Sequence, residues 1–279
     1  MTEIYQSQLT PESDTKKQFL ETEFQLLQRA IPAKETSTAT HNIHSYPAKF
    51  IPHFPRLMIK HYTNGGDFVL DPMCGSGTTM IEASLLGRYS TGIDLDPISY
   101  LISKVATTPI EDNRIEFLTN KFVGSLKEKM KPNAVKKIDL PTDEEFPNAS
   151  PFWFRPEVMR ELIFIRDQMD EIEDSELRDV AKLSLSNIAR DVSNADPRDI
   201  FPQRDKDLLV RERKDVYLEF VRSLKRVTTK IRKFTLGVEN KNLAEVILGD
   251  SRKIEKESDT FDLVCTSPPY AYAMDYPRV

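Results

Sequence analysis

The chain has 279 residues, a net charge of −5, and 39% hydrophobic against 30% charged residues. This length is enough for a full hydrophobic core and for more than one structural unit. The sequence has no apolar run near the ~18 residues of a membrane span and no signal-peptide pattern. Its two cysteines, both at predicted strand ends, fit buried thiols in a reducing, cytoplasmic setting. Because the chain is acidic, contact with nucleic acid would require a local basic patch.

The segment before the first predicted strand is expected to be peripheral. One amphipathic helix is predicted at 15–30 and another at 55–62. No cysteine and no interleaved acid accompanies the histidines of this region, so no metal site is predicted. They are interpreted as ordinary polar contacts, and they are His41, His44, His53 and His61.

A glycine turn, Asp-Pro-Met-Cys-Gly-Ser-Gly-Thr-Thr at 71–79, organises the chain. It follows an apolar run at 68–70 and precedes a helical pattern at 80–86, which predicts strand, tight turn and helix. Glycine permits close approach of a ligand, and the helix start offers free N–H groups. A second predicted strand ends in Asp94, which is placed to accept hydrogen bonds from ribose hydroxyls. This half of the chain is predicted to bind a nucleoside-containing cofactor.

Three residues of the turn narrow the choice of cofactor. Thr78 stands where a phosphate loop needs lysine, and Met80 stands where a dinucleotide fold has its third glycine. The carboxylate of Asp71 would repel a pyrophosphate but suits a cationic amine. S-adenosylmethionine is therefore favoured, while another nucleotide or a purely structural turn stays open.

A second motif lies near the end of the sequence, where the predicted strand 261–265 runs into Thr-Ser-Pro-Pro-Tyr at 266–270. Together with the glycine turn, it resembles the amino-methylating DNA methyltransferases. Ser-Pro-Pro-Tyr is similar to the subgroup that acts on cytosine N4, whereas the adenine-N6 subgroup more often has Asp or Asn in place of Ser267. The resemblance implies an α/β, Rossmann-like S-adenosylmethionine-dependent methyltransferase fold with a helical insertion. It also implies a role in a restriction-modification system.

The resemblance assigns cofactor contacts to several segments. The segment 45–50 would line the methionine end, with Lys49 or nearby backbone meeting the carboxylate; the alternative is a surface loop. Asp94 would bind the ribose, while Asp96 caps the next helix, and Asp250 would contact the adenine or serve as a turn residue. The predicted cofactor-binding residues are Tyr46, Lys49, Phe50, Asp71, Pro72, Cys74, Gly75, Ser76, Gly77, Thr78, Asp94 and Asp250.

The chemistry of the second motif follows from its residue types. An exocyclic base amine is a poor nucleophile because its lone pair is delocalised into the ring. Acceptors at Ser267 Oγ and the Pro268 carbonyl would localise that lone pair, and Pro268 and Pro269 would hold them in place. Tyr270 can stack on a base flipped out of the duplex. C5 methylation would need a cysteine after proline, and the sequence has no Pro-Cys pair.

The predicted organisation is a peripheral segment 1–40, a cofactor half 41–107, a helical insertion 108–242 and the remaining strands 243–279. Within the insertion, helices are predicted at 113–131, 156–171, 175–192 and 213–233. Basic residues there can neutralise DNA phosphates or form a solvated helix face. The predicted DNA-binding residues are Arg211, Arg213, Arg222, Lys225, Arg226 and Lys230.

Four parallel strands are predicted, near 68, 90, 246 and 262. The resemblance implies a seven-stranded sheet, so this sheet would be incomplete. An exposed edge strand is normally covered, which leads to the hypothesis that a second polypeptide completes the sheet; the alternative is an inactive fragment. The expected partner is double-stranded DNA, without a membrane or a metal. Adenine-N6 methylation, RNA guanine-N2 methylation and a non-catalytic DNA-binding subunit stay open as alternatives.

Overall fold

The computed structural model describes residue 22 and residues 39–46, 49–142, 144–146, 152–196, 203–205, 212–240, 243–254 and 259–268. Within these ranges, four parallel strands form one sheet in the order β3-β2-β1-β4. They are β1 (Phe68–Asp71), β2 (Tyr89–Asp94), β3 (Ala244–Leu248) and β4 (Leu263–Val264). All four lie where the sequence predicted them, and the predicted α/β fold is confirmed. The helix predicted at 15–30 lies, apart from Thr22, outside the described residues.

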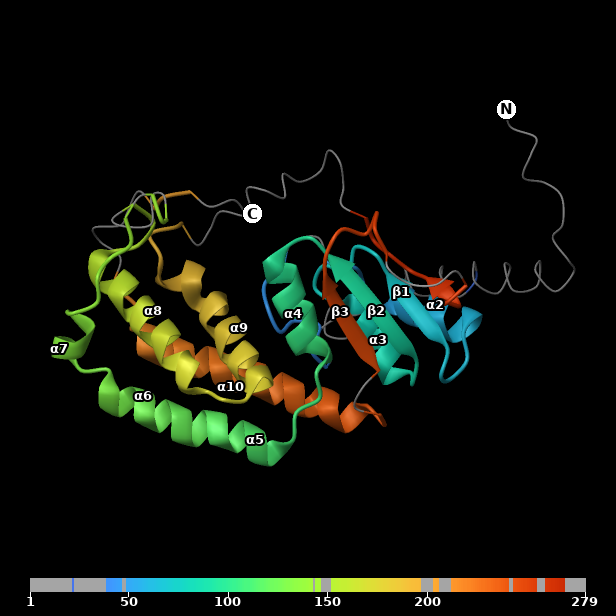
Figure 1. Cartoon of the computed structure of the whole chain (residues 1–279), viewed down its shortest axis with the longest axis horizontal. Coiled ribbons are helices and arrows are strands. Elements are labelled where there is room, and N and C mark those ends of the chain that lie inside the picture. The colour runs from blue at the N-terminus through green and yellow to red at the C-terminus, as the bar shows by residue number, and fades with distance from the viewer. Residues whose placement is uncertain are drawn as a thin grey trace, which may run out of the picture.

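Three helices accompany the sheet: α2 (His53–Tyr62), α3 (Thr78–Leu85) and α4 (Pro97–Thr107). α3 connects β1 to β2, and α4 follows β2 (Figure 1). The side chain of Asp96 accepts hydrogen bonds from the backbone N–H groups of Ile98 and Ser99, which confirms the predicted helix cap. Because the strands are parallel, all four carboxyl ends lie at one edge of the sheet.

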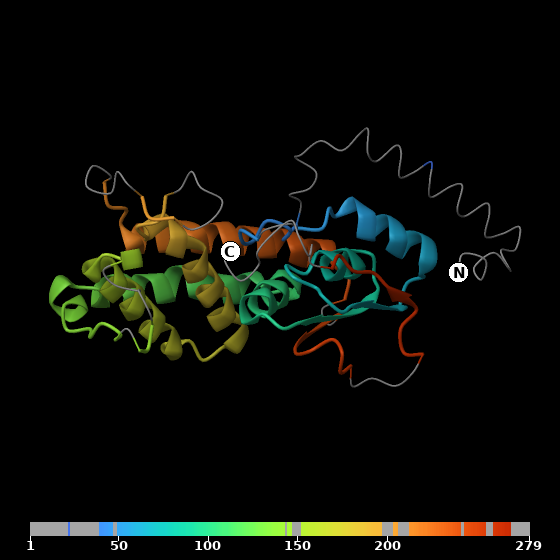
Figure 2. The ribbon, with the colours of Figure 1, turned by 90° about the horizontal axis from the view of Figure 1, so that it is seen from above.

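The remaining helices lie between α4 and β3 in the chain and beside the sheet in space, as Figure 2 shows. The predicted helix 175–192 is matched by α9, whereas the one predicted at 113–131 is interrupted by a π-helical segment. Their bounds are α5 (Asp112–Glu116), the π-helix η2 (Phe117–Phe122), α6 (Val123–Lys129), α7 (Pro132–Val135), α8 (Pro156–Gln168), the 3-10 helix η4 (Met169–Glu171), α9 (Ser175–Val192) and α10 (Val216–Gly237).

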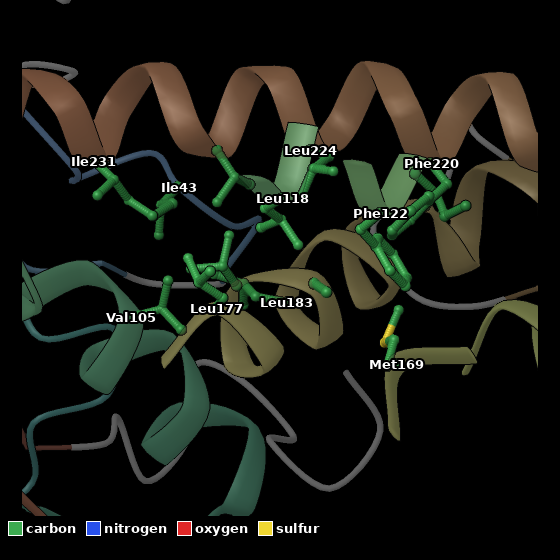
Figure 3. Close-up of a cluster of buried hydrophobic side chains, with 14 of the residues drawn as sticks. Ile43, Val105, Leu118, Phe122, Met169, Leu177, Leu183, Phe220, Leu224 and Ile231 are labelled. Carbon is green, nitrogen blue, oxygen red and sulfur yellow. The ribbon is translucent and has the colours of Figure 1, made fainter. Parts of the chain in front are cut away.

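One hydrophobic core joins these helices to the sheet. α10 buries one face through apolar residues spaced by three and four. These residues belong to the same buried cluster as Val105 of α4 and Ile43 (Figure 3). A smaller cluster of Ile59, Val69 and Ala83 lies between the sheet and its helices. The cofactor half and the helical unit are therefore packed together. Among the described residues, no helix is long and apolar enough to span a membrane.

Candidate active site

The glycine turn lies between the end of β1 at Asp71 and the start of α3 at Thr78. Gly75 and Gly77 have positive φ, 50° and 80°, a region that favours glycine. A Cβ on Gly75 would lie 3.2 Å from the Tyr46 ring, and one on Gly77 would lie 3.0 Å from Cβ of Ser103 on α4. The turn is thus held between Tyr46 and α4, and a side chain at either glycine would strain it.

Asp71 is an internal acid at the end of β1, with only 3% of its surface exposed. Burial raises the pKa of its carboxyl group, while nearby hydroxyls of Thr79 and Thr266 and the Met73 N–H oppose that shift. Thr79 Oγ1 donates to the Cys265 carbonyl at 3.3 Å. This hydrogen bond joins α3 to the end of β4. Both threonines lie within the two motifs, at the end of 71–79 and the start of 266–270, but the motifs assign neither of them a role.

Asp94 ends β2 and lies directly across from the turn. Its Oδ2 accepts a hydrogen bond from Gly75 N at 2.8 Å, and its Oδ1 accepts one from Asp96 N at 3.0 Å. Each oxygen retains a lone pair for a further donor. Leu95 and Ile98, which follow, are 68% and 44% exposed. Sequence reasoning missed these two apolar side chains, although a leucine between two acids was a signal.

Asp250 lies just beyond β3 and pairs with a residue that the sequence analysis did not consider. The Arg252 guanidinium donates to both of its oxygens, with Nε at 3.0 Å from each and Nη2 at 2.6 Å from Oδ2. This partner lowers the pKa of the Asp250 carboxyl to about 2. The Gly249 N–H donates to the Asp94 carbonyl at 2.9 Å, which brings this loop next to the end of β2.

The three residues predicted before the turn take different positions. The Tyr46 ring covers Gly75, and its hydroxyl accepts a hydrogen bond from Ser99 Oγ at 3.0 Å. Lys49 Nζ instead donates to the His41 carbonyl at 3.0 Å and the His44 carbonyl at 2.6 Å. Phe50 lies against Phe54 of α2, with ring centroids 5.2 Å apart. Of the three, only Tyr46 has a described contact with the glycine turn.

The remaining predicted turn residues are mostly buried. Cys74 and Cys265 are each 5% exposed, which confirms the interpretation of both as small buried residues. Burial raises the pKa of the Cys74 thiol, and that of Cys265 to about 11. Ser76 and Thr78 are buried as well, at 7% and 5% exposure. Pro72 is half-buried in the turn.

The second motif leaves the sheet beside the turn. Leu263 and Val264 of β4 pair with Val69 and Leu70 of β1, so Ser267 and Pro268 extend past the strand end where Asp71 lies. Ser267 is half-buried and Pro268 exposed. Pro269 and Tyr270 lie outside the described residues. The described half of the motif and the glycine turn therefore share the carboxyl edge of the sheet, where ligands bind in open α/β sheets.

Glu82, His41 and Arg56 form a hydrogen-bonded network next to the glycine turn. Glu82 of α3 is 0% exposed and accepts hydrogen bonds from His41 Nε2 at 2.7 Å and from Arg56 Nε at 2.6 Å. His44 contacts the Ser45 carbonyl and Ser186 Oγ. In the part of the chain that the structure describes, no group of three or more His, Cys, Asp or Glu residues could hold a metal ion.

The predicted DNA-binding residues differ in their partners. Arg213 forms an ion pair with Glu161, and Arg222 pairs with Glu219. Arg211 lies outside the described residues. Over the described ranges, no ion pair is formed by the other three, which are Lys225, Arg226 and Lys230.

Comparison with known proteins gives matches of two kinds. The N6/N4 methyltransferase family model, described as DNA methylase, matches residues 3–104. Type II methyltransferase M.MvaI of Kocuria varians is 27% identical over 84% of this chain and 54% of its own length. Type II methyltransferase M.MjaII of Methanocaldococcus jannaschii is 24% identical over 87% of this chain and 61% of its own length.

The chain thus spans between about half and three fifths of the length of these relatives. A shorter match, 40% identical over 52 residues, is the tRNA (guanine(10)-N2)-dimethyltransferase of Methanothermobacter thermautotrophicus, with 18% of this chain and 16% of that protein covered. Nothing in these comparisons supports the hypothesis of a second polypeptide. The family match covers the first third of the chain, which holds the glycine turn, and the chain is thus similar to the amino-methylating DNA methylases.

Proposed function

We propose that this chain acts as an S-adenosylmethionine-dependent DNA methyltransferase that methylates an exocyclic base amine, with cytosine N4 as the target. The observation that carries the proposal is the shared position of two motifs. Ser267 and Pro268 leave β4 at the edge of the sheet where the glycine turn and Asp94 lie. Type II methyltransferases among the relatives support the same activity.

The residues at this edge fit S-adenosylmethionine. Asp94 offers acceptor lone pairs for ribose hydroxyls, and the exposed Leu95 and Ile98 offer an apolar surface for the adenine ring. Asp250 can accept from the adenine amine if Arg252 yields one of its contacts. When bound, the cofactor supplies an electrophilic methyl group.

The chain's own contribution to transfer is to prepare the base amine. Ser267 Oγ and the Pro268 carbonyl accept the two N–H groups of the amine, so its lone pair localises on nitrogen. Because a proline backbone has few accessible conformations, these acceptors are fixed before the base arrives. The amine then acts as the nucleophile without a covalent bond to the protein. Tyr270 would stack on the flipped base.

Double-stranded DNA is the proposed substrate, bound through the basic residues of α10 that form no ion pair with a described residue. A basic helix face adds affinity that does not depend on sequence, because it neutralises phosphates. Serine before the two prolines supports cytosine over adenine.

The decisive variant is Ser267→Ala, with Ser125→Ala on α6 as a control remote from the motif. Ser267→Ala should lower methyl transfer to duplex DNA by roughly 10²-fold or more, as expected for loss of one preorganised contact. Binding of DNA and cofactor should stay unchanged. Nucleoside digestion and mass analysis of the product identify the base. N6-methyladenine would overturn the assignment to cytosine, and full activity of Ser267→Ala would overturn the mechanism.

Methylation of RNA guanine N2 is a second candidate, because a tRNA dimethyltransferase matches over 52 residues. The same assay with a tRNA transcript as substrate separates the two. Transfer to RNA alone would replace the DNA proposal.

A further inference from the structure

The basic side chains of α10 fall into two groups. Arg222 pairs with Glu219 at 2.6 Å, and Arg232 pairs with Asp112 at 2.7 Å. Lys225, Arg226, Lys230 and Lys233 form no ion pair with any described residue. Successive spacings of four and three place Arg226, Lys230 and Lys233 on one face of the helix. A helix that pairs some cations and leaves a row of others unpaired has charge available for an external anion.

A fourth cation reaches this face from a distant part of the chain. Ile43 is buried against the same cluster as Ile231 of α10, and Figure 3 shows the two side chains next to each other. Asn187 Nδ2 of α9 donates to the Ile43 carbonyl at 3.0 Å. The segment 39–46 is thereby fixed on the helical unit. Lys49 bonds back onto this segment through the carbonyls of His41 and His44.

The ammonium of Lys49 is held in place but not neutralised. Its two described acceptors are carbonyl oxygens, which orient the group and leave its charge uncompensated. Burial and, after it, the charge of Lys230 lower the pKa of Lys49 to about 8. Burial and the charges of Lys233 and Arg226 lower the pKa of Lys230. Lys49 and Arg226 also contribute to the lowered pKa of His44, after burial.

Four like charges in one place repel one another, and bringing them together opposes folding. An anion placed among them would remove that repulsion and gain several charge-assisted hydrogen bonds. The composition of the cluster, three ammonium groups and one guanidinium, suits phosphate oxygens. The alternative, a basic helix face that is only solvated, does not account for a partly buried cation that comes from another part of the chain.

We propose that Lys49, Arg226, Lys230 and Lys233 form a binding site for neighbouring backbone phosphates of duplex DNA. Lys49 then belongs to the DNA-binding surface, whereas the family resemblance placed it at the methionine end of the cofactor. Tyr46, three residues earlier, covers the glycine turn at Gly75. The same segment therefore fixes the position of a DNA phosphate relative to the cofactor site. This inference rests on the proposed DNA substrate.

The test compares an unpaired cation with a paired one on the same helix. Lys230→Gln and Lys49→Gln remove members of the cluster, and Arg222→Gln is the matched control. Binding of the full chain to a fluorescent DNA duplex is measured by anisotropy over a range of salt concentrations. Each lost phosphate contact should reduce the steepness of the plot of log K against log salt by about 0.9. If a variant and the unchanged protein bind equally at 1 M salt, the variant should then bind on the order of eightfold more weakly at 0.1 M salt.

Lys230→Gln and Lys49→Gln should show this loss, and Arg222→Gln should show little of it. Cofactor affinity, measured by calorimetry, should be unchanged in Lys49→Gln. The proposal is overturned if Arg222→Gln weakens binding as much as Lys230→Gln, if Lys49→Gln lowers cofactor affinity instead, or if the chain binds no duplex. A loss of slope with a tRNA transcript but not with the duplex would assign the site to RNA and overturn it as well. Because the assay measures binding, an absence of methyl transfer would count against the proposed function alone.

Discussion

Adding one methyl group at Gly92 should disturb the packing of α3 on β2. A Cβ at this position would lie 2.1 Å from Met80 Sδ and 3.0 Å from Cβ of Cys74. Met80 is fully buried, so its side chain has nowhere to move without displacing neighbours. Overpacking of this kind typically costs about 1–3 kcal/mol. Gly92→Ala should therefore lower the free energy of unfolding by about that amount.

A double-mutant cycle makes the reasoning sharper. Met80→Ala alone should cost about 2–5 kcal/mol, since it leaves a cavity in the core. In the double variant, the new methyl group at residue 92 occupies part of the space that Met80 vacates. The cost of Gly92→Ala should then almost vanish, which corresponds to a coupling of about 1–3 kcal/mol between the two positions.

Urea unfolding followed by far-UV circular dichroism measures all four corners of the cycle. Gly124→Ala is the control, because no atom lies within 4 Å of its added Cβ; on a helix it should be neutral or stabilising by up to about 1 kcal/mol. Additive costs for Gly92→Ala and Met80→Ala would refute the idea that these residues compete for one space.

Two further predictions concern buried and half-buried charges. Glu82→Ala should lower the free energy of unfolding by about 1–3 kcal/mol, because it leaves the buried ring of His41 without its hydrogen-bond partner; urea midpoints measure this. Lys49 has a pKa of about 8 in the folded chain, against an ordinary lysine value of 10.5, so the unfolded chain binds more protons between these two pH values. The free energy of unfolding contributed by Lys49 should therefore rise with pH from about 8 to 10.5, and Lys49→Gln should remove that rise. A melting series across this pH range, identical for both proteins, would contradict the assignment.

The strands and most helices could be predicted because each carries its own local pattern. Asp174, for example, caps α9 by accepting from the N–H groups of Glu176 and Leu177, and an acid before an amphipathic run is visible in sequence. The π-helical segment Phe117–Phe122 was not predictable. Its buried residues Leu118 and Phe122 are four apart, a spacing that an ordinary α-helix would show as well.

The sequence predicted which residues belong to the candidate site where a local pattern marks them. It did not predict the contacts between residues that are far apart in the chain. Asp94 follows from its place at the end of a strand. The orientation of the Lys49 side chain depends on the backbone carbonyls of a folded loop and on the charges of α10. A sequence motif contains no information on either. For the same reason, the pairing of Arg222 with Glu219 and the unpaired state of Lys230 required the structure, since both belong to the same basic stripe in the sequence.

The pairing of β1 with β4 explains why two motifs far apart in the sequence lie side by side. Leu70 pairs with Val264, and the Cys265 N–H donates to the Leu70 carbonyl at 2.9 Å. Thr79 Oγ1 of α3 donates to the Cys265 carbonyl at 3.3 Å. The helix that follows the glycine turn is therefore bonded to the segment that leads into Ser267. The segment 39–46 holds the turn from the other side, because Tyr46 lies on the turn while Ile43 lies in the core beside α10. The turn is thus fixed from both directions, by the end of β4 and by the helical unit.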